Sequence, residues 1–238
     1  FARTDVKVIL SGVGGDELFG GYRRYLGNHY QQYFEMLPSW MRRTAVAVGE
    51  RLPSDRHSHL LNISRLARGF LTSAELSFED RYKAYIEVFS GREIDRMSHV
   101  SGINRPDVIR DAFGRADSED ALNRMLAVDA QTQLPDDLLL LTDKMSMATS
   151  LECRVPLLDH ELVELAASMP EAIKVKGGRL KHVLKQATAD LLPPDILERK
   201  KRGFGTPMGA WLRGELAPLR DSLLSEEAVR ARGLFEPA

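Results

Sequence analysis

The sequence has only one cysteine and no long run of apolar residues. A single cysteine, Cys153, excludes an internal disulfide framework. No stretch approaches the roughly 18 consecutive apolar residues of a membrane-spanning helix, and the charged start at residues 1–5 does not resemble a secretory signal. We therefore expect a cytoplasmic protein that does not engage a membrane.

Histidine and aromatic residues are also sparse. The six histidines are too scattered for a zinc site, apart from His57 and His59, so we expect no structural metal. No aromatic residues alternate with the lysines as they do on single-strand platforms, which argues against a nucleic-acid partner. With 43% hydrophobic and 28% charged residues, the 238-residue chain is typical of one large or two small globular domains.

The net charge of -1 hides an uneven distribution. Residues 171–220 contain eleven Lys or Arg and five acids, so this segment carries +6 and the remainder -7. A basic segment in an acidic chain suggests a polyanionic ligand, with phosphate as the first candidate. On charge alone, a solvated basic face is the more common explanation.

The N-terminal region predicts a buried parallel strand that ends in a glycine-rich loop. Residues 6–10 are short and rich in β-branched side chains, and Ser11-Gly-Val-Gly-Gly15 follows directly. A helix is expected next, with Asp16 at its cap or in its first turn. Its apolar positions are Leu18, Phe19, Tyr22, Tyr25 and Leu26. Missing sheet neighbours would leave this strand at an edge with exposed apolar surface.

The rest of the sequence predicts mostly helices. Apolar residues recur at helical spacing over 162–169 and 180–191, and Pro135 is a good start for a helix through Ala148. Residues 27–118 indicate several helices joined by polar loops, without a chemical motif. We expect a mostly α-helical chain with one or two short strands.

The glycine loop could bind an anion. Small residues between a strand and a helix let backbone N–H groups approach a phosphate, although a tight turn explains them equally well. The spacing is neither G-x-G-x-x-G nor a phosphate loop ending in Gly-Lys-Ser/Thr. Asp16 beside such a site would be a natural Mg²⁺ ligand, and its alternative role is a helix cap.

Three ordered blocks resemble one family. Leu10–Tyr25 is similar to the second nucleotide-site motif of glutamine-hydrolysing asparagine synthetases. The stretch Leu134–Asp159 resembles the family's most recognisable helix and turn, and Gly178–Lys185 with Leu192–Leu212 resembles its C-terminal region. Together these blocks are far more specific than any one of them alone.

The resemblance implies an α/β parent fold with a parallel sheet, of the adenine nucleotide α-hydrolase type. The family's first phosphate loop, Ser-Gly-Gly-x-Asp-Ser, and its N-terminal glutaminase domain do not occur in this sequence. Residues 1–238 are therefore interpreted as the C-terminal portion of a synthetase domain, which alone should be inactive. The glutaminase domain would be a partner in the same parent chain, and a homodimer is also compatible.

The implied activity is that of an ATP-dependent amide-forming ligase in asparagine biosynthesis. A carboxylate, most simply aspartate, would form an acyl-adenylate that ammonia from glutamine converts to the amide. By resemblance, Ser11 and Gly12 correspond to ATP contacts and Asp16 to a ligand of Mg²⁺. Lys181 corresponds to the lysine that neutralises phosphate charge in the transition state. Without the resemblance, Lys181 would be a lysine on the wet face of an amphipathic helix.

Val13 departs from the family pattern, because asparagine synthetases usually carry a glutamate there. Valine can neither accept nor donate a proton. Related amidotransferases from polysaccharide loci resemble this variant, so the acceptor could be another carboxylate. Glu152 is our candidate to replace the missing carboxylate, although an ion pair with Arg154 is the slightly favoured alternative. A scaffold that binds ligands without catalysis is the third hypothesis, and Val13 alone motivates it.

Overall fold

The computed structural model describes residues 1–52, 59–98, 106–199 and 207–237. His57 of the sparse histidine pair lies outside them, as do Lys200, Lys201 and Arg202 of the basic segment. The chain divides into two compact units. Unit 1 comprises residues 1–86 and 107–193, and unit 2 comprises residues 87–106 and 194–238.

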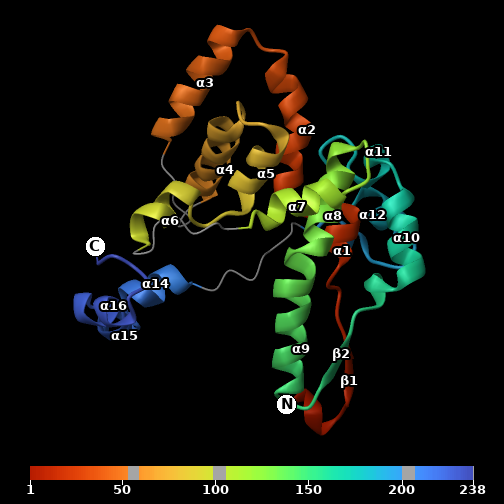
Figure 1. Ribbon diagram of the computed structural model, residues 1–238. Coiled ribbons are helices and arrows are strands. Elements are labelled where there is room, and N and C mark those ends of the chain that lie inside the picture. Colours follow the sequence, from red (N-terminus) through yellow and green to blue (C-terminus); the bar gives the residue numbers. More distant parts are fainter. Residues whose placement is uncertain (53–58, 99–105, 200–206, 238) are drawn as a thin grey trace. The chain divides into compact units, whose positions relative to one another are not determined.

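Unit 1 holds both strands and most of the helices (Figure 1). Its elements in the first part of the chain are η1 (Ala2–Thr4), β1 (Val8–Leu10), α1 (Gly15–Phe19), α2 (Arg23–Glu35), α3 (Ser39–Arg51), α4 (His59–Ser73) and α5 (Phe78–Ile86). The others are α7 (Val108–Arg115), α8 (Ala121–Gln131), the π-helical turn η2 (Leu134–Leu139), α9 (Leu140–Met147), β2 (Glu152–Arg154), η3 (Pro156–Leu158), α10 (His160–Ser168), α11 (Glu171–Lys174) and α12 (His182–Ala187).

Unit 2 is helical throughout its described residues. Its helices are α6 (Gly91–Met97), α13 (Pro194–Leu197), α14 (Met208–Arg213), α15 (Ala217–Leu223) and α16 (Glu226–Arg232). An antiparallel bridge between Ser98 and Phe235 ties its two chain segments together, and Glu236 N donates to Met97 O at 2.8 Å. The expectation of a mostly helical chain with one or two short strands is thus confirmed for the described residues.

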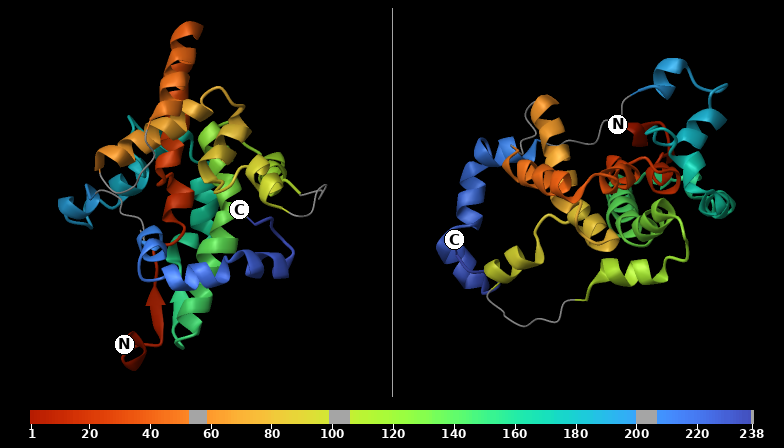
Figure 2. Two further views of the ribbon diagram at one scale, coloured as in Figure 1. Left: turned by 90° about the vertical axis from the view of Figure 1, so that its left-hand side faces the viewer. Right: turned by 90° about the horizontal axis from the view of Figure 1, so that it is seen from above.

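The two strands form a parallel pair, as the sequence predicts, and β1 is shorter than expected. Val8 lies opposite Glu152 and Leu10 opposite Arg154, whose carbonyl accepts from Ser11 N at 2.8 Å. The left view of Figure 2 shows the strand pair without a further strand beside it, and the described residues form no third strand. Leu10 is consequently 74% exposed, so the predicted burial of this strand is wrong and its predicted edge position is confirmed.

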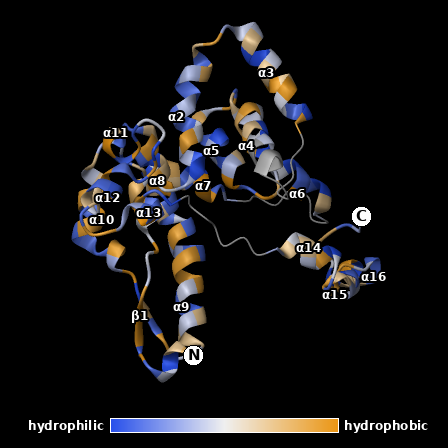
Figure 3. Ribbon diagram, turned by 180° about the vertical axis from the view of Figure 1, so that it is seen from behind, coloured by the Kyte–Doolittle hydropathy of each residue, from blue (hydrophilic) through white to orange (hydrophobic). Residues whose placement is uncertain are grey.

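Apolar side chains remain exposed along this side of unit 1. Figure 3 shows hydrophobic residues along β1 and α9. Leu140, Leu141 and Met145 of α9 are each about half exposed, as is Val8 of β1. A two-stranded sheet buries little surface and is marginal by itself, so the stability of unit 1 must come from its helices.

The main core of unit 1 forms where α2, α5, α7 and α8 meet. Its buried members include Tyr25, Tyr82, Phe113 and Met125. The aromatic rings of Tyr82 and Phe113 pack edge to face at 5.2 Å, a geometry that the ring quadrupoles favour. This core fixes the position of α2, the second helix after the glycine loop.

The helix expected after the glycine loop is in fact two helices. Gly20 ends α1 with a φ of 71°, a left-handed conformation that glycine adopts without a Cβ penalty. Tyr22 then caps α2 in an extended conformation. The apolar spacing from Leu18 to Leu26 is helical on both sides of the break, and for this reason the periodicity alone did not reveal it.

A second core cluster attaches α1 to the C-terminal helices of unit 1. Leu18 and Phe19 of α1 pack with the fully buried Ala166 of α10, against Val183 and Leu184 of α12 among others. Both C-terminal helices were expected from their periodicity, but α12 begins only at His182. The position of α12 relative to the glycine loop is thereby set by apolar packing.

Candidate functional site

The glycine loop connects the end of β1 to α1 and leaves open space above Gly12. Gly12 is exposed, and a Cβ built there would meet no atom within 4 Å. Ser11 Oγ accepts a hydrogen bond from Val13 N at 3.3 Å, which holds the turn. Gly14 has a φ of 92° and caps α1. The two residues expected to contact a nucleotide, Ser11 and Gly12, are therefore adjacent at an accessible strand end.

Asp16 and Lys181, both singled out from the sequence, form an ion pair. Lys181 Nζ lies 2.9 Å from Asp16 Oδ1, and both side chains remain about one quarter exposed. A Cβ on Gly15 would stand 3.6 Å from Lys181 Nζ, so the ammonium lies directly beside the glycine loop. The structure thus collects a loop, a carboxylate and an ammonium at one accessible place.

Gly21 makes room for this pair. A Cβ at Gly21 would overlap both Asp16 Oδ1 and Lys181 Cε, so only glycine allows the two side chains to meet there. Gly21 N also donates to Asp16 O at 2.9 Å, which closes the turn after α1. Sequence analysis missed Gly21; the paired glycines inside an apparently helical pattern were the available signal.

Lys181 does not lie on a helix face, contrary to the sequence-based alternative. It precedes α12 as the N-cap residue, with a φ of 54° and a ψ of 36°. A non-glycine residue in this left-handed region costs of order 1 kcal/mol and persists only where its surroundings hold it. Leu180 packs on the main core, and Val183 and Leu184 pack on the second cluster. Apolar anchors on both sides therefore hold Lys181 over the loop.

A buried polar network begins at Glu17, the residue that follows Asp16. Glu17, 1% exposed, accepts a hydrogen bond from the Tyr22 hydroxyl. The guanidinium of Arg24 lies 4.3 Å from the Tyr22 ring centroid and donates to Asp129 Oδ2 at 2.6 Å. Burial and the neighbouring carboxylate raise the pKa of Tyr22, so it remains a donor. Sequence reasoning treated Glu17 and Tyr22 only as helix residues.

Asp129 is the centre of that network. Its two carboxylate oxygens accept from the hydroxyls of Tyr25 and Tyr82, and it is 1% exposed. Burial together with the Asp129 charge raises the pKa of both tyrosines. A buried carboxylate is tolerable only when it is fully hydrogen-bonded and paired, and here a guanidinium and two hydroxyls meet that condition. The network joins α2, α5 and α8.

Glu152 is not brought to the loop. It opposes Val8 at the start of β2, whereas the loop follows the carboxyl end of β1. Two residue steps along a strand correspond to roughly 7 Å. The Glu152 carboxylate forms an ion pair with Arg154, and both side chains are at least half exposed. The alternative of a local ion pair is thus the arrangement observed.

Not every described charge of the basic segment is available to an anion. Lys174 is buried and donates to Asn123 Oδ1 at 2.7 Å, and desolvation lowers its pKa to about 8. Arg220 pairs with its neighbour Asp221. The segment also crosses from unit 1 into unit 2. Lys181 is a described member of this segment that lies beside the glycine loop.

The described residues contain no cluster of three or more His, Cys, Asp and Glu side chains suited to hold a metal by themselves. Magnesium, however, usually takes one or two protein carboxylates and completes its shell with water and substrate phosphates. One accessible carboxylate next to an open loop, Asp16, fits that requirement.

In the described part of the chain, no helix has the length and apolar character of a membrane span.

Comparison with known proteins places the whole chain in one family. The family model for asparagine synthase matches residues 1–238, and the chain belongs to that family. It is 33% identical over 232 residues to asparagine synthetase [glutamine-hydrolyzing] 1 of Bacillus subtilis, covering 97% of this chain and 35% of that protein. The resemblance noted from the sequence motifs is confirmed.

Other relatives agree. A putative asparagine synthetase [glutamine-hydrolyzing] of Mycobacterium tuberculosis is 37% identical over 221 residues, covering 90% of this chain and 32% of that protein. Asparagine synthetase [glutamine-hydrolyzing] 3 of Bacillus subtilis is 30% identical over 202 residues, which are 85% of this chain and 27% of that protein. The chain thus spans about a third of the length of these relatives. No solved structure matches it.

Proposed function

We propose that this chain supplies the second half of the ATP site in an ATP-dependent amide-forming ligase. The observation that carries the proposal is the Asp16–Lys181 pair, held beside the loop that contains Ser11 and Gly12. These four residues were selected from sequence alone; Ser11, Gly12 and Asp16 lie within six consecutive positions, and Lys181 comes from a distant segment of the chain. Their convergence at one accessible strand end supports a common function.

In this proposal Ser11 and Gly12 contact ATP and Lys181 stabilises charge on its phosphates. An oxygen of the substrate carboxylate attacks the α-phosphorus, and the bond to pyrophosphate breaks. Lys181 is a preorganised cation beside the oxygens on which negative charge increases. Ammonia then attacks the acyl carbon of the adenylate, and the carbon–oxygen bond to AMP breaks.

Asp16 is the residue that would hold Mg²⁺, which neutralises pyrophosphate charge when it is bound. In the present structure Asp16 holds Lys181 instead. Binding of phosphate and metal would therefore replace this ion pair by a contact of Lys181 with phosphate and a contact of Asp16 with the metal. The pair keeps both side chains oriented toward the loop before substrate arrives.

The family's first phosphate loop and the glutaminase domain would come from other parts of a longer parent protein. The parent sheet would be of the adenine nucleotide α-hydrolase type, with β1 and β2 continuing it. The exposed faces of β1 and α9 support this, since they leave apolar surface for neighbouring elements. The acceptor is proposed to be aspartate, and glutamine to be the source of ammonia, as the names of the relatives suggest.

The test is pyrophosphate exchange into ATP by the intact parent protein with single carboxylates added in turn. Aspartate-dependent exchange that requires Mg²⁺ would support the proposal. Exchange with a different carboxylate alone would retain the ligase and replace the acceptor. An absence of exchange with any carboxylate, in a protein that is folded and hydrolyses glutamine, would contradict the proposed ATP chemistry.

A further inference from the structure

The helix that carries Asp16 is too short to fix its own direction. α1 has five residues, and Gly20 ends it. Such a short helix is not stable alone, because nucleation costs more than its few hydrogen bonds return. The direction of the Asp16 side chain therefore depends on contacts that α1 makes with other elements. Leu18 and Phe19 supply apolar contacts to the second core cluster.

The turn between α1 and α2 is closed by two hydrogen bonds that run side by side in the sequence. The backbone N–H of Gly21 donates to Asp16 O at 2.9 Å. The hydroxyl of Tyr22 donates to the carboxylate of Glu17, which is 1% exposed. The two acceptors are consecutive residues of α1, and the two donors are consecutive residues after it. Tyr22 and Glu17 thus add a side-chain bond to the backbone bond that closes the turn.

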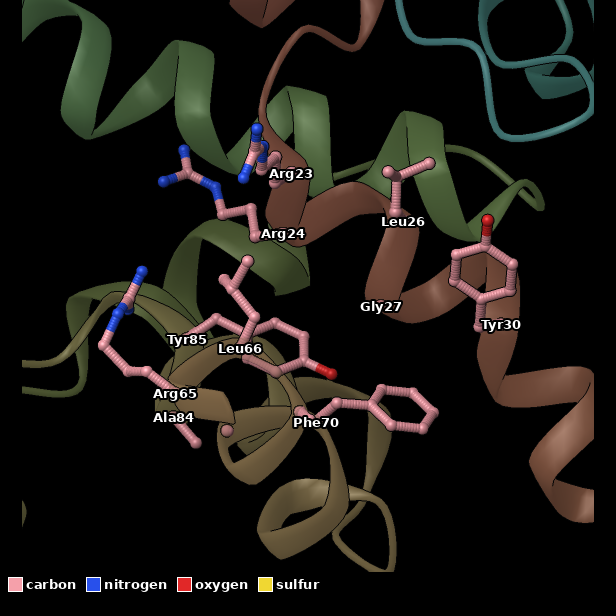
Figure 4. Close-up of a pocket in the computed structure, with 12 residues that line it drawn as sticks. Arg23, Arg24, Leu26, Gly27, Tyr30, Arg65, Leu66, Phe70, Ala84 and Tyr85 are labelled. Atoms are coloured by element: carbon pink, nitrogen blue, oxygen red, sulfur yellow. The ribbon is translucent and has the colours of Figure 1, made fainter. Parts of the chain in front are cut away.

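Tyr22 is itself held by contacts that lead to the main core. The guanidinium of Arg24 lies 4.3 Å from the Tyr22 ring centroid, a distance typical of cation–π contacts. Arg24 donates to Asp129 of α8 and to Gln133 just after it, each at 2.6 Å. Figure 4 shows the Arg24 side chain projecting from the first turn of α2, where it also lines a cavity between α2, α4 and α5. The Tyr22 ring is therefore anchored on the side of α8.

The closed turn sets the space in which Asp16 meets Lys181. A Cβ on Gly21 would overlap Asp16 Oδ1 and Lys181 Cε, so the two side chains lie directly against the backbone of the turn. An opening of the turn would move Gly21 relative to α1 and change the separation of the pair. The hydrogen bond from Tyr22 to Glu17 opposes such an opening.

We propose that Tyr22 is a positioning residue of the ATP site, which acts through Glu17 to hold α1 in the orientation that directs Asp16 toward Lys181. The inference rests on the proposed function, since it concerns the residue that would hold Mg²⁺. Hydrogen-bonded partners behind a metal ligand typically change metal affinity or activity by about 10- to 100-fold. The alternative is that the same hydrogen bond only stabilises the fold, and the test separates the two.

Tyr25 offers a matched control on the same helix. Its hydroxyl donates to the carboxylate of Asp129, which is 1% exposed like that of Glu17. Tyr22→Phe and Tyr25→Phe each leave a buried carboxylate with one donor fewer, so both should lower stability. Tyr25→Phe leaves the bonds across the turn in place. A shared effect of the two variants reports on stability, and a difference between them reports on the turn.

The first measurement does not depend on activity. Lysines of the intact parent protein are acetylated with N-hydroxysuccinimide acetate at a temperature where circular dichroism shows each variant folded. Peptide mass spectrometry gives the rate at Lys181 relative to that at Lys185. We expect Tyr22→Phe to raise this ratio about threefold or more, because loss of a partly exposed ion pair frees the amine. Tyr25→Phe should leave it unchanged, and Asp16→Asn should give its upper limit. Equal ratios in the two tyrosine variants would overturn the proposal.

Two Glu17 variants test the same hydrogen bond from its acceptor, and they decide the question if Tyr22→Phe does not fold. Glu17→Gln keeps an oxygen that accepts from the Tyr22 hydroxyl, whereas Glu17→Met has a similar length and no such acceptor. We expect the wild-type labelling ratio for the glutamine variant and a raised ratio for the methionine variant. The same ratio in both would contradict a role for this hydrogen bond.

The second measurement is the Mg²⁺ dependence of single-turnover pyrophosphate release by the same proteins. We expect Tyr22→Phe to raise the Mg²⁺ concentration at half-maximal rate about tenfold or more, and Tyr25→Phe to stay within a few-fold of wild type. An equal rise in both variants would reduce Tyr22 to a stabilising role. If wild type releases no pyrophosphate, the proposed function fails, whereas a labelling ratio raised in Tyr22→Phe alone still supports the positioning of Asp16.

Discussion

Lys181 Nζ lies 2.9 Å from Asp16 Oδ1, and Gly21 is the residue that lets them meet. The two charged residues lie on different elements. Asp16 is in the first turn of α1, and Lys181 directly precedes α12. Val183 and Leu184 of α12 pack against the cluster that contains Phe19 of α1, which brings those elements together. The site is therefore a consequence of core formation in unit 1.

Asp16→Asn in the intact parent protein should abolish pyrophosphate release and leave glutaminase activity nearly unchanged. The amide is a neutral and much weaker ligand than a carboxylate for Mg²⁺ on pyrophosphate. The effect on stability should be small, roughly 1 kcal/mol or less, because the pair with Lys181 is partly exposed. Both activities are to be measured on the same preparation. Parallel loss of both would indicate a folding defect and reduce Asp16 to a structural role.

Gly21→Ala should separate Asp16 from Lys181. Its Cβ would occupy the space of both side chains, and such overpacking typically costs about 1–3 kcal/mol. The melting temperature should fall together with pyrophosphate release. Gly12→Ala is the matched control for stability, since its Cβ enters open space. A Gly21→Ala protein with unchanged melting temperature and rate would show that the pair is not required.

The sequence predicted a parallel strand before the glycine loop and the helical character of the chain, and it singled out Asp16 and Lys181, which the structure places together. Those predictions depended on local signals: a β-branched run before glycines, helical spacing, and a family motif. The break at Gly20 and Gly21 was missed because apolar spacing continued on both sides of it. The left-handed conformation of Lys181 was missed because nothing in a lysine's neighbours predicts a positive φ.

Long-range polar contacts were beyond sequence reasoning. Asp129 of α8 binds Arg24 and Tyr25 of α2 and Tyr82 of α5, and no spacing rule connects these positions. Lys174 appeared to be a surface lysine because it belongs to a basic segment, whereas the fold buries it against Asn123. Such contacts follow from how helices pack, which the pattern of a single segment does not determine.

Lys174 should make stability depend on pH. Its pKa in the folded chain is about 8, below the ordinary value near 10.4. Between these values the unfolded chain binds a proton that the folded chain does not, so stability rises with pH. Relative to Lys174→Met, wild type should gain about 1–2 kcal/mol between pH 7.5 and 9.5. Urea unfolding at each pH measures this. A constant difference would show that Lys174 keeps its ordinary pKa.

Val13→Glu in the intact parent protein tests the acceptor. Val13 lies in the glycine loop, where its backbone N–H donates to Ser11 Oγ, and asparagine synthetases usually carry a glutamate at this position. If aspartate is the acceptor, pyrophosphate release with aspartate should be kept or increased. A lowered native activity, together with no gain for aspartate, would favour another carboxylate as substrate.

The comparison of Lys181→Ala with Lys185→Ala tests the central claim most directly. Lys185 belongs to the same basic segment and lies one turn into α12, with its N–H bonded to Lys181 O at 3.0 Å. Both replacements keep a Cβ, so Lys181→Ala leaves the cost of the left-handed backbone unchanged. Neither variant should change the melting temperature by more than a few degrees.

The measurement is pyrophosphate release by the intact parent protein under single-turnover conditions, at several ATP concentrations. Lys181→Ala should lose roughly 2–4 kcal/mol of transition-state stabilisation, about 30- to 1000-fold in rate, at saturating ATP. Lys185→Ala should stay within a few-fold of wild type. Equal rates for the two variants, or recovery of Lys181→Ala at higher ATP, would contradict a transition-state role for Lys181.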